Sequence, residues 1–214
     1  MSEILLIRHG ESHFNTKDTH ELDSSLTQRG RQQCFTCGNF LRRKFDDMSD
    51  WKGLVSPFLR TIQTADIINR YTDCNFEIEW QAREFSHISS GYSGDTVLKI
   101  PCHKKQFPDF YPDHIPDDHV FTQKMETNED LLNRASEFIT ELQEDDDKYI
   151  IISHGQMIYT MIYIMNGTYK VPIWDKKILN TSVTYFKEDN MVYFARFVNN
   201  GKDPRRESWE YVMI

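Results

Sequence analysis

The chain has 214 residues, of which 39% are hydrophobic and 27% are charged, and this composition predicts a single globular domain, 1–214, with a substantial core. A formal net charge of −8 and a pI of about 5.5 argue against nucleic acid or an anionic membrane as a partner. No apolar run is long enough to span a bilayer, and the apolar run near the start is too short for a signal peptide. An anionic substrate would therefore need a local cationic pocket. Nothing in the sequence indicates the oligomeric state.

The first predicted element is a short strand, Ile4–Ile7, whose consecutive apolar residues indicate burial on both faces. Arg8 and His9 follow it directly, and Gly10 then allows a tight turn or a close approach to a ligand. Ligands of open α/β sheets bind beyond the carboxyl ends of the strands, so Arg8 and His9 stand where chemistry is expected. On this stretch alone, two solvated polar residues at a strand end explain the pattern equally well.

The next predicted element is a helix with Thr27 as its N-cap that extends to about Phe45. It contains Cys34-x-x-Cys37, a spacing found in redox sites and in metal sites. Because both cysteines fit the apolar face of the helix and no second CxxC exists, we favour core packing. The simplest interpretation of the cysteines is a reduced, cytoplasmic protein.

A second strand, Trp51–Val55, leads into a second predicted helix. Ser56 as N-cap, with Pro57 at the first helical position, predicts where this helix begins. Arg60 lies about one turn into the helix, near the same strand-end rim as Arg8.

A third strand, Phe76–Trp80, alternates with period two, is expected near an edge of the sheet, and brings Glu84 to the rim. Periodicity is then lost in an insertion, about 87–123, which we predict to be a cap over the site. Its aromatic residues favour an ordered segment packed on the domain, and its cations could meet a second anionic group of a substrate. A solvated loop is the alternative. The possible cap residues are His87, Lys99, Lys104 and Lys105.

Thr127 with Asp130 predicts the capped start of another helix, which ends before an acidic run. Tyr149–Ile152 is the second continuous apolar run and predicts a central parallel strand that ends in Ser153-His154-Gly155. The later predictions are a helix through 157–165, strands at 181–187 and 191–198, and a tail whose Trp209 and Tyr211 pack on the body.

Strands that alternate with helices predict an α/β fold, a three-layer α/β/α sandwich around a mostly parallel sheet, with the insertion after the third strand. Strand ends then bring five side chains to one rim: Arg8, His9, Arg60, Glu84 and His154. Each alone has an ordinary structural explanation, but their convergence by chance is much less probable.

Phosphoryl transfer is the chemistry that this set of side chains suits. Two guanidinium groups match phosphate oxygens, and a neutral imidazole can attack phosphorus and hold the phosphoryl group covalently. A second imidazole can stabilise the transferred group, and Glu84 can protonate the leaving oxygen and later activate water. His9 and His13 are four residues apart, but Gly10 at the strand exit argues against a shared helical face, and no HExxH motif exists, so a zinc site is disfavoured.

The chain resembles the histidine phosphatase superfamily, in the branch of phosphoglycerate mutases and fructose-2,6-bisphosphatase-like phosphatases. The resemblance covers about residues 4 to 165. The motifs that carry it are Arg8-His9-Gly10-Glu11-Ser12 with Asn15, Leu26-Thr27 with Gly30, Ser56-Pro57 with Arg60-Thr61 and Gln63-Thr64-Ala65, Glu84, Glu126-Thr127, and Ser153-His154-Gly155.

By resemblance, His9 is the phosphorylated nucleophile and Glu84 the proton donor. Arg8, Arg60 and His154 form the phosphate pocket, with Asn15 and Gly155 as further contacts. The departures from the family pattern, which affect the rim and so the substrate, are Phe14 where Trp is common, Met125 where Gly is usual, and Gln156 where mutases often have Asn.

The expected activity is hydrolysis of phosphate monoesters, chiefly of small phosphorylated metabolites, with no cofactor and no metal. Phosphoproteins as substrates, a mutase, and a catalytically silent phosphate-binding scaffold are the alternatives. The mutase is disfavoured because the family's Arg-His-Tyr-Gly stretch after the acid is replaced here by Phe85-Ser86-His87-Ile88-Ser89.

Overall fold

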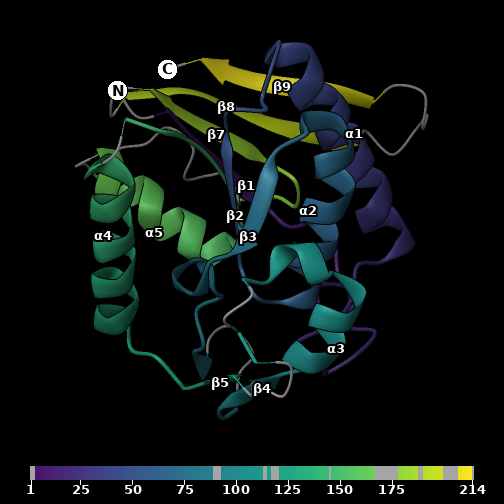
Figure 1. The fold of residues 1–214 in the computed structure, drawn as a ribbon, viewed down its shortest axis with the longest axis vertical. Helices are drawn as coiled ribbons and strands as arrows, with labels where there is room; N and C mark the ends of the chain where they lie inside the picture. Colours follow the sequence, from purple (N-terminus) through teal and green to yellow (C-terminus); the bar gives the residue numbers. More distant parts are fainter. Residues whose placement is uncertain are drawn as a thin grey trace.

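A seven-stranded sheet in the order β3-β2-β6-β1-β7-β8-β9 forms the centre of the computed structural model (Figure 1). The structure describes residues 3–88, 93–112, 115–116, 121–144, 146–166, 178–187, 190–199 and 207–213. The strands of the sheet are β1 (Glu3–Arg8), β2 (Lys52–Val55), β3 (Asn75–Ile78), β6 (Lys148–Ser153), β7 (Val183–Lys187), β8 (Asn190–Asn199) and β9 (Glu207–Met213).

The direction of the strands confirms a mostly parallel sheet. β3, β2, β6 and β1 pair in parallel. β7 then pairs antiparallel with β1, β8 with β7, and β9 with β8. Since β8 is antiparallel to β7, which is itself antiparallel to β1, β8 runs the same way as the parallel strands. The two central strands are the two continuous apolar runs, Ile4–Ile7 and Tyr149–Ile152, both buried.

Helices cover both faces of the sheet, which confirms the three-layer sandwich (Figure 1). α1 (Gln28–Lys44) and α2 (Leu59–Thr72) contribute to one apolar core, and α4 (Asn128–Glu144) and α5 (Gly155–Asn166) contribute to the other. No helix in the described ranges is long and apolar enough to cross a membrane.

The cysteines of α1 belong to the core, as predicted. Cys34 and Cys37 are fully buried, and all four cysteines are free thiols. Burial raises the pKa of Cys34 to about 11 and the pKa of Cys37 well above its ordinary value, so both remain protonated and unreactive at neutral pH.

The predicted starts of α1 and α4 are confirmed, and the predicted start of α2 is wrong. Thr27 caps α1, since its Oγ1 accepts the N–H of Gly30 at 2.9 Å, and Thr127 and Asp130 exchange reciprocal hydrogen bonds at α4. The Ser56-Pro57 start is wrong, because α2 begins at Leu59 and its N-cap Phe58 makes no side-chain capping bond.

The physical reason lies in contacts distant in sequence. The backbone of Ser56 continues the pairing of β2, where its N–H donates to the carbonyl oxygen of Ile152 at 3.0 Å. Its hydroxyl is hydrogen-bonded to His154 instead of to the helix. The N–H of Leu59 is satisfied by Oδ1 of Asp23, 36 residues earlier in the chain, at 2.7 Å.

The insertion at 87–123 is ordered and packed in its described part, as its aromatic residues predicted. It contains α3 (Ile100–Gln106), a 3₁₀ turn η3 (Pro108–Phe110), and a small antiparallel pair, β4 (Thr96–Leu98) and β5 (Phe121–Gln123). Phe110 and Tyr111 join the core on the α1/α2 side. In Figure 1, α3, β4 and β5 lie together at the lower end of the molecule, below the central strands.

The C-terminal region confirms the two predicted strands as β7 and β8, although β7 begins two residues later than expected. The tail with Trp209 and Tyr211 forms a further strand, β9, which pairs with β8 at the edge of the sheet. The backbone of the tail therefore lies against the body, but its strand was not predicted.

Candidate active site

The carboxyl ends of β1, β2 and β6 bring the predicted side chains together. Arg8 is the last residue of β1, and His9 and His154 directly follow β1 and β6. Arg60 lies in the first turn of α2, and Glu84 lies on the loop after β3 and the 3₁₀ turn η1 (Trp80–Ala82). Nitrogen atoms of the two histidines and a carboxylate oxygen of Glu84 all lie within 4.8 Å of one another.

His9 is buried in an orientation that leaves one ring nitrogen available as a nucleophile. Its Nδ1 lies 2.6 Å from the carbonyl oxygen of Gly10, which only accepts, so we assign the ring proton to Nδ1. Nε2 then carries a lone pair and accepts a hydrogen bond from Nε of Arg60 at 3.3 Å. Burial, and next the charges of Arg60 and Arg8, lower the pKa of His9 well below its ordinary value, so the ring stays neutral at pH 7.

Gly10 is required by close packing behind His9. A Cβ atom on Gly10 would lie only 2.7 Å from both the carbonyl oxygen of Gly30 and Sγ of Cys34. The strand end that carries His9 is thus pressed against the first turns of α1, and a side chain at Gly10 would displace it.

His154 is fully buried beside His9, with ring centroids 5.2 Å apart. Nη2 of Arg60, which only donates, lies 3.1 Å from Nδ1 of His154, and Oγ of Ser56 lies 2.7 Å from Nε2. We therefore assign the proton to Nε2, which donates to Ser56. Burial and the charge of Arg60 lower the pKa of His154 well below its ordinary value, so this ring is also neutral.

Arg60 contacts both histidines and Glu84, and its side chain is only 2% exposed. Its guanidinium donates to both histidines and lies 3.7 Å from Oε2 of Glu84. Nη1 donates to the carbonyl oxygen of Leu22 at 2.6 Å, and Cζ lies 4.6 Å from the centre of the Phe58 ring. These contacts fix a planar donor beside Nε2 of His9.

Arg8 lies over the start of α5. Its Nη1 donates to the carbonyl oxygen of Ile178, and Nε is buried without a hydrogen-bond partner among the described groups. A Cβ atom on Gly155 would lie 3.4 Å from Cζ of Arg8, so the helix start packs directly under the guanidinium. A buried donor without a partner, next to a helix N-terminus, is suited to an anionic oxygen.

Glu84 has the properties expected of an acid that can hold its proton. Its side chain is 16% exposed, Oε1 accepts the N–H of Phe85 at 3.0 Å, and Oε2 lies 3.4 Å from Nδ1 of His154. Burial raises the pKa of Glu84 above its ordinary value, while the charge of Arg60 opposes this effect.

Two polar residues at the site were missed by the sequence analysis. Nδ2 of Asn180 donates to the carbonyl oxygen of His9 at 2.9 Å and to Oδ1 of Asn15 at 3.2 Å. The N–H of Thr181 donates to the carbonyl oxygen of Arg8 at 2.9 Å, and Thr181 has a φ of 57°, which is strained for a β-branched residue. No sequence signal marks a contact that spans 171 residues.

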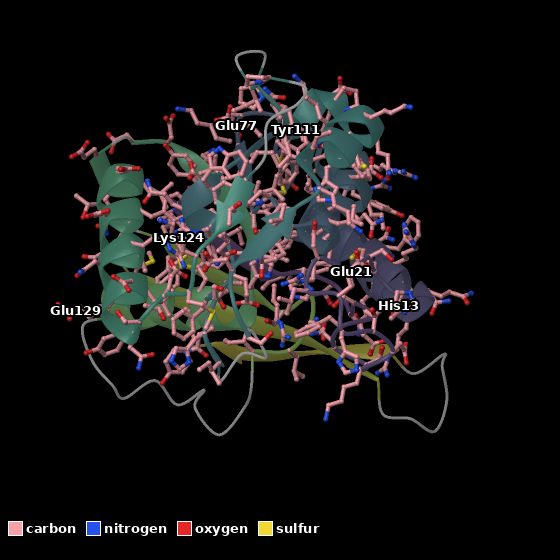
Figure 2. All side chains as sticks on the ribbon, turned by 90° about the horizontal axis from the view of Figure 1, so that it is seen from below. His13, Glu21, Glu77, Tyr111, Lys124 and Glu129 are labelled. Carbon is pink, nitrogen blue, oxygen red and sulfur yellow. The ribbon has the colours of Figure 1, made fainter. Side chains whose placement is uncertain are left out.

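Asn15 itself is exposed at the rim, where its Oδ1 also accepts the N–H of Ser12 at 3.2 Å. Among the possible cap residues, Lys99 pairs with Glu21, which is labelled in Figure 2, and Nζ of Lys104 donates to the carbonyl oxygen of Ile115 at 2.6 Å. Lys105 is exposed. The ring of His87 stacks on that of Phe85, with centroids 5.0 Å apart.

A metal ion would find three ligand atoms in His9, Glu84 and His154. However, Arg60 donates hydrogen bonds to both of these histidines and lies beside the carboxylate, and a second cation there would be repelled. The electrostatics of the site therefore favour an anion over a metal.

The sequence profile of the histidine phosphatase superfamily (branch 1) matches residues 4–201. Among curated proteins, the chain is 30% identical over 167 residues to the 6-phosphofructo-2-kinase/fructose-2,6-bisphosphatase of Aquarana catesbeiana, a match that covers 77% of this chain and 33% of that protein. The corresponding enzyme 1 of Mus musculus is 29% identical over 76% of this chain and 32% of its own length. The chain thus spans about a third of the length of these relatives.

Solved structures share the fold. The ecdysone phosphate phosphatase of Bombix mori in complex with tungstate has a TM-score of 0.66 at 14% identity, covering 90% of this chain and 92% of that one. The phosphoserine phosphatase of Entamoeba histolytica in complex with 3-phosphoglyceric acid has a TM-score of 0.59 at 21% identity, covering 87% and 91%. The profile match over most of the sequence, on a fold shared with these proteins, shows that this chain belongs to the histidine phosphatase superfamily, branch 1.

Proposed function

We propose that the protein is a phosphatase that hydrolyses phosphate monoesters of small phosphorylated metabolites through a phosphohistidine on His9. The observation that carries the proposal is the environment of Nε2 of His9. It bears a lone pair in a neutral ring, because Nδ1–H is held by Gly10, and it faces Arg60 and His154. This arrangement supplies a nucleophile and a cationic, hydrogen-bonding cradle for the group that it attacks.

In the first step, Nε2 of His9 attacks phosphorus while the bond to the ester oxygen breaks, and Glu84 transfers its proton to that oxygen. In the second step, water attacks the phosphorus, Glu84 takes a proton from the water, and the P–N bond breaks. Inorganic phosphate leaves, and both His9 and Glu84 return to their starting protonation states. Arg8 and Arg60 donate to the equatorial oxygens throughout, and His154 lies beside them as part of the phosphate pocket.

Neither a cofactor nor a metal is needed for these steps, and the cationic surroundings of His9 support metal independence. Small phosphoesters as substrates are supported by the likeness to a fructose-2,6-bisphosphatase relative and to a phosphoserine phosphatase structure. Asn15 and Gly155 are proposed as further phosphate contacts. The negative net charge supports a protein without nucleic-acid or membrane partners, and four free thiols support a cytoplasmic location.

We propose in addition that 87–123 caps the site and selects the substrate. Both ends of the insertion lie near the site, since it follows Glu84 and since Nε2 of Gln123 donates to the carbonyl oxygen of Glu84. A surface hollow of about 410 Å³ on the insertion is lined by Pro101, Lys104, Lys105 and Pro108 and is suited to an anionic group.

The test is release of inorganic phosphate from p-nitrophenyl phosphate and from a panel that includes fructose 2,6-bisphosphate, phosphoserine and 3-phosphoglycerate, with and without chelator. We expect chelator-resistant hydrolysis of at least one natural ester. Faster interconversion of 2- and 3-phosphoglycerate than phosphate release would establish the mutase instead. Binding of phosphate without turnover of any ester would indicate a silent scaffold.

A further inference from the structure

A buried ion pair lies outside the proposed catalytic set, directly behind the loop that carries Glu84. Arg134 of α4 and Glu126, just before α4, are 7% and 9% exposed. They form a two-point contact, with Nε to Oε1 at 2.8 Å and Nη2 to Oε2 at 2.7 Å. Nη2 of Arg83, on the loop itself, reaches Oε1 of Glu126 at 2.9 Å.

This pair holds the backbone of the loop on both sides of Glu84. Before Glu84, Nη1 of Arg134 donates to the carbonyl oxygens of Gln81 at 2.6 Å and of Arg83 at 3.1 Å. After Glu84, two hydrogen bonds join Glu126 to Ser86. The N–H of Glu126 donates to the carbonyl oxygen of Ser86 at 2.7 Å, and the N–H of Ser86 donates to Oε2 of Glu126 at 3.3 Å.

Two further donors complete the support of the loop. Oγ of Ser153, at the end of β6, donates to the carbonyl oxygen of Ala82 at 2.6 Å, and Nε2 of Gln123 donates to that of Glu84. The carbonyl oxygens of 81, 82, 83, 84 and 86 thus all accept bonds from side chains or backbone outside the loop. The loop has no regular secondary structure beyond η1, so these bonds are what fix its course.

We propose that Glu126 and Arg134 are positioning residues for the reaction: their buried ion pair fixes the loop 81–86 and so holds the carboxyl group of Glu84 where it reaches the leaving oxygen. The inference rests on the proposed function, in which Glu84 is the proton donor. Proton transfer requires hydrogen-bond reach, and displacement of a catalytic group by about 1 Å can cost roughly 10²-fold in rate. Burial raises the pKa of Glu84, and the positive charge of Arg134 is one of the smaller effects that oppose this rise.

The test compares two esters of similar size, phenyl phosphate with a poor leaving group and p-nitrophenyl phosphate with a good one. Arg134→Lys keeps the charge but cannot bond Glu126 at two points and two carbonyls at once. We expect it to lose about tenfold or more in kcat on phenyl phosphate and much less on p-nitrophenyl phosphate. Glu126→Gln should show the same asymmetry, whereas Glu129→Gln, the same change at an exposed residue labelled in Figure 2, should show neither loss.

The pH profile separates positioning from a general loss of structure. Arg134→Met removes the charge that lowers the pKa of Glu84, so Glu84 stays protonated to higher pH and the descending limb of kcat/KM should move to higher pH. Arg134→Lys should leave the limb in place. If Arg134→Met does not fold, Gln123→Ala takes its place. This variant removes the side chain that donates to the carbonyl oxygen of Glu84, and it should also slow phenyl phosphate more than p-nitrophenyl phosphate. Vanadate binding confirms in each variant that the phosphate pocket is intact.

Glu84→Gln, assayed in parallel, distinguishes the two ways of failing. If Glu84→Gln slows both esters alike, the proposed role of Glu84 is wrong and the inference falls with it. If Glu84→Gln shows the asymmetry but Arg134→Lys and Glu126→Gln slow both esters alike, or neither, the inference alone is overturned.

Discussion

At the scale of single residues, the site is explained by what burial does to charge. Arg60 is buried, donates hydrogen bonds to two neutral histidines and to the carbonyl oxygen of Leu22, and lies 3.7 Å from the carboxyl group of Glu84. The types and positions of His9, Arg60 and His154 were evident from strand ends in the sequence. Their protonation states were not, since these depend on neighbours such as Ser56 and the carbonyl of Gly10.

We expect Arg60→Ala to lower kcat/KM by roughly 10²–10³-fold, the usual scale for removing one electrostatic donor at a transition state. Loss of the guanidinium also removes the hydrogen bonds that orient both rings. The exposed Arg42→Ala is the matched control and should be near wild type. A loss below about tenfold, measured with p-nitrophenyl phosphate, would show that Arg60 does not contact the transferred group.

The directions of the pKa shifts predict an acidic optimum. The lowered pKa of His9 keeps the nucleophile neutral well below pH 6.5, so the ascending limb of kcat/KM should lie on the acid side of that value. The raised pKa of Glu84 keeps the acid protonated to a higher pH than 4.5, which places the descending limb above that value. In Glu84→Gln the descending limb should disappear. Activity that rises steadily from pH 5 to 9 would contradict both assignments.

At the scale of elements, the helices and strands that have strong periodicity and local caps were predictable. The start of α2 was not, because a distant residue took the place of the local cap. Asp23 accepts the N–H of Leu59 and lies 3.2 Å from Nε2 of His103 in the insertion. The carbonyl oxygen of the adjacent Leu22 accepts a hydrogen bond from Arg60, so one loop fixes both the start of α2 and the side chain of Arg60.

Asp23→Ala should therefore lower the free energy of unfolding by about 1–2 kcal/mol, the scale of a lost N-cap, and should also lower kcat. Asp23→Asn retains an acceptor for Leu59 and should lose less of both. Urea unfolding, with the exposed Asp18→Asn as control, measures the effect. An unchanged stability for Asp23→Ala would mean that the Leu59 N–H is satisfied in another way.

The insertion gives the second prediction at this scale. Lys104→Ala/Lys105→Ala should leave kcat/KM for p-nitrophenyl phosphate nearly unchanged and reduce it about tenfold or more for the best natural ester, since desolvated contacts to phosphate are worth on the order of 1 kcal/mol or more. The exposed pair Arg42→Ala/Arg43→Ala controls for the loss of two charges. An equal response of both substrates would reduce the insertion to a scaffold.

At the scale of the whole molecule, the fold was predictable because two apolar runs and the alternation of elements define a parallel sheet, whose carboxyl edge gathers the motifs. The contacts that could not be predicted join residues far apart in sequence. Asn180 bonds the backbone of His9, and Arg134 reaches back to Gln81. Each such contact depends on tertiary geometry, for which neither periodicity nor spacing carries a signal.

Detection of a phosphoenzyme is the most direct test of the role proposed for His9. Rapid quench with ³²P-labelled substrate should trap phosphate that is labile to acid and stable to base, bound to His9 in the wild-type protein. His9→Ala, in which Arg60 and His154 remain, should trap none. Label retained in His9→Ala, or turnover of the wild type without any trapped label, would show that His9 is not the nucleophile.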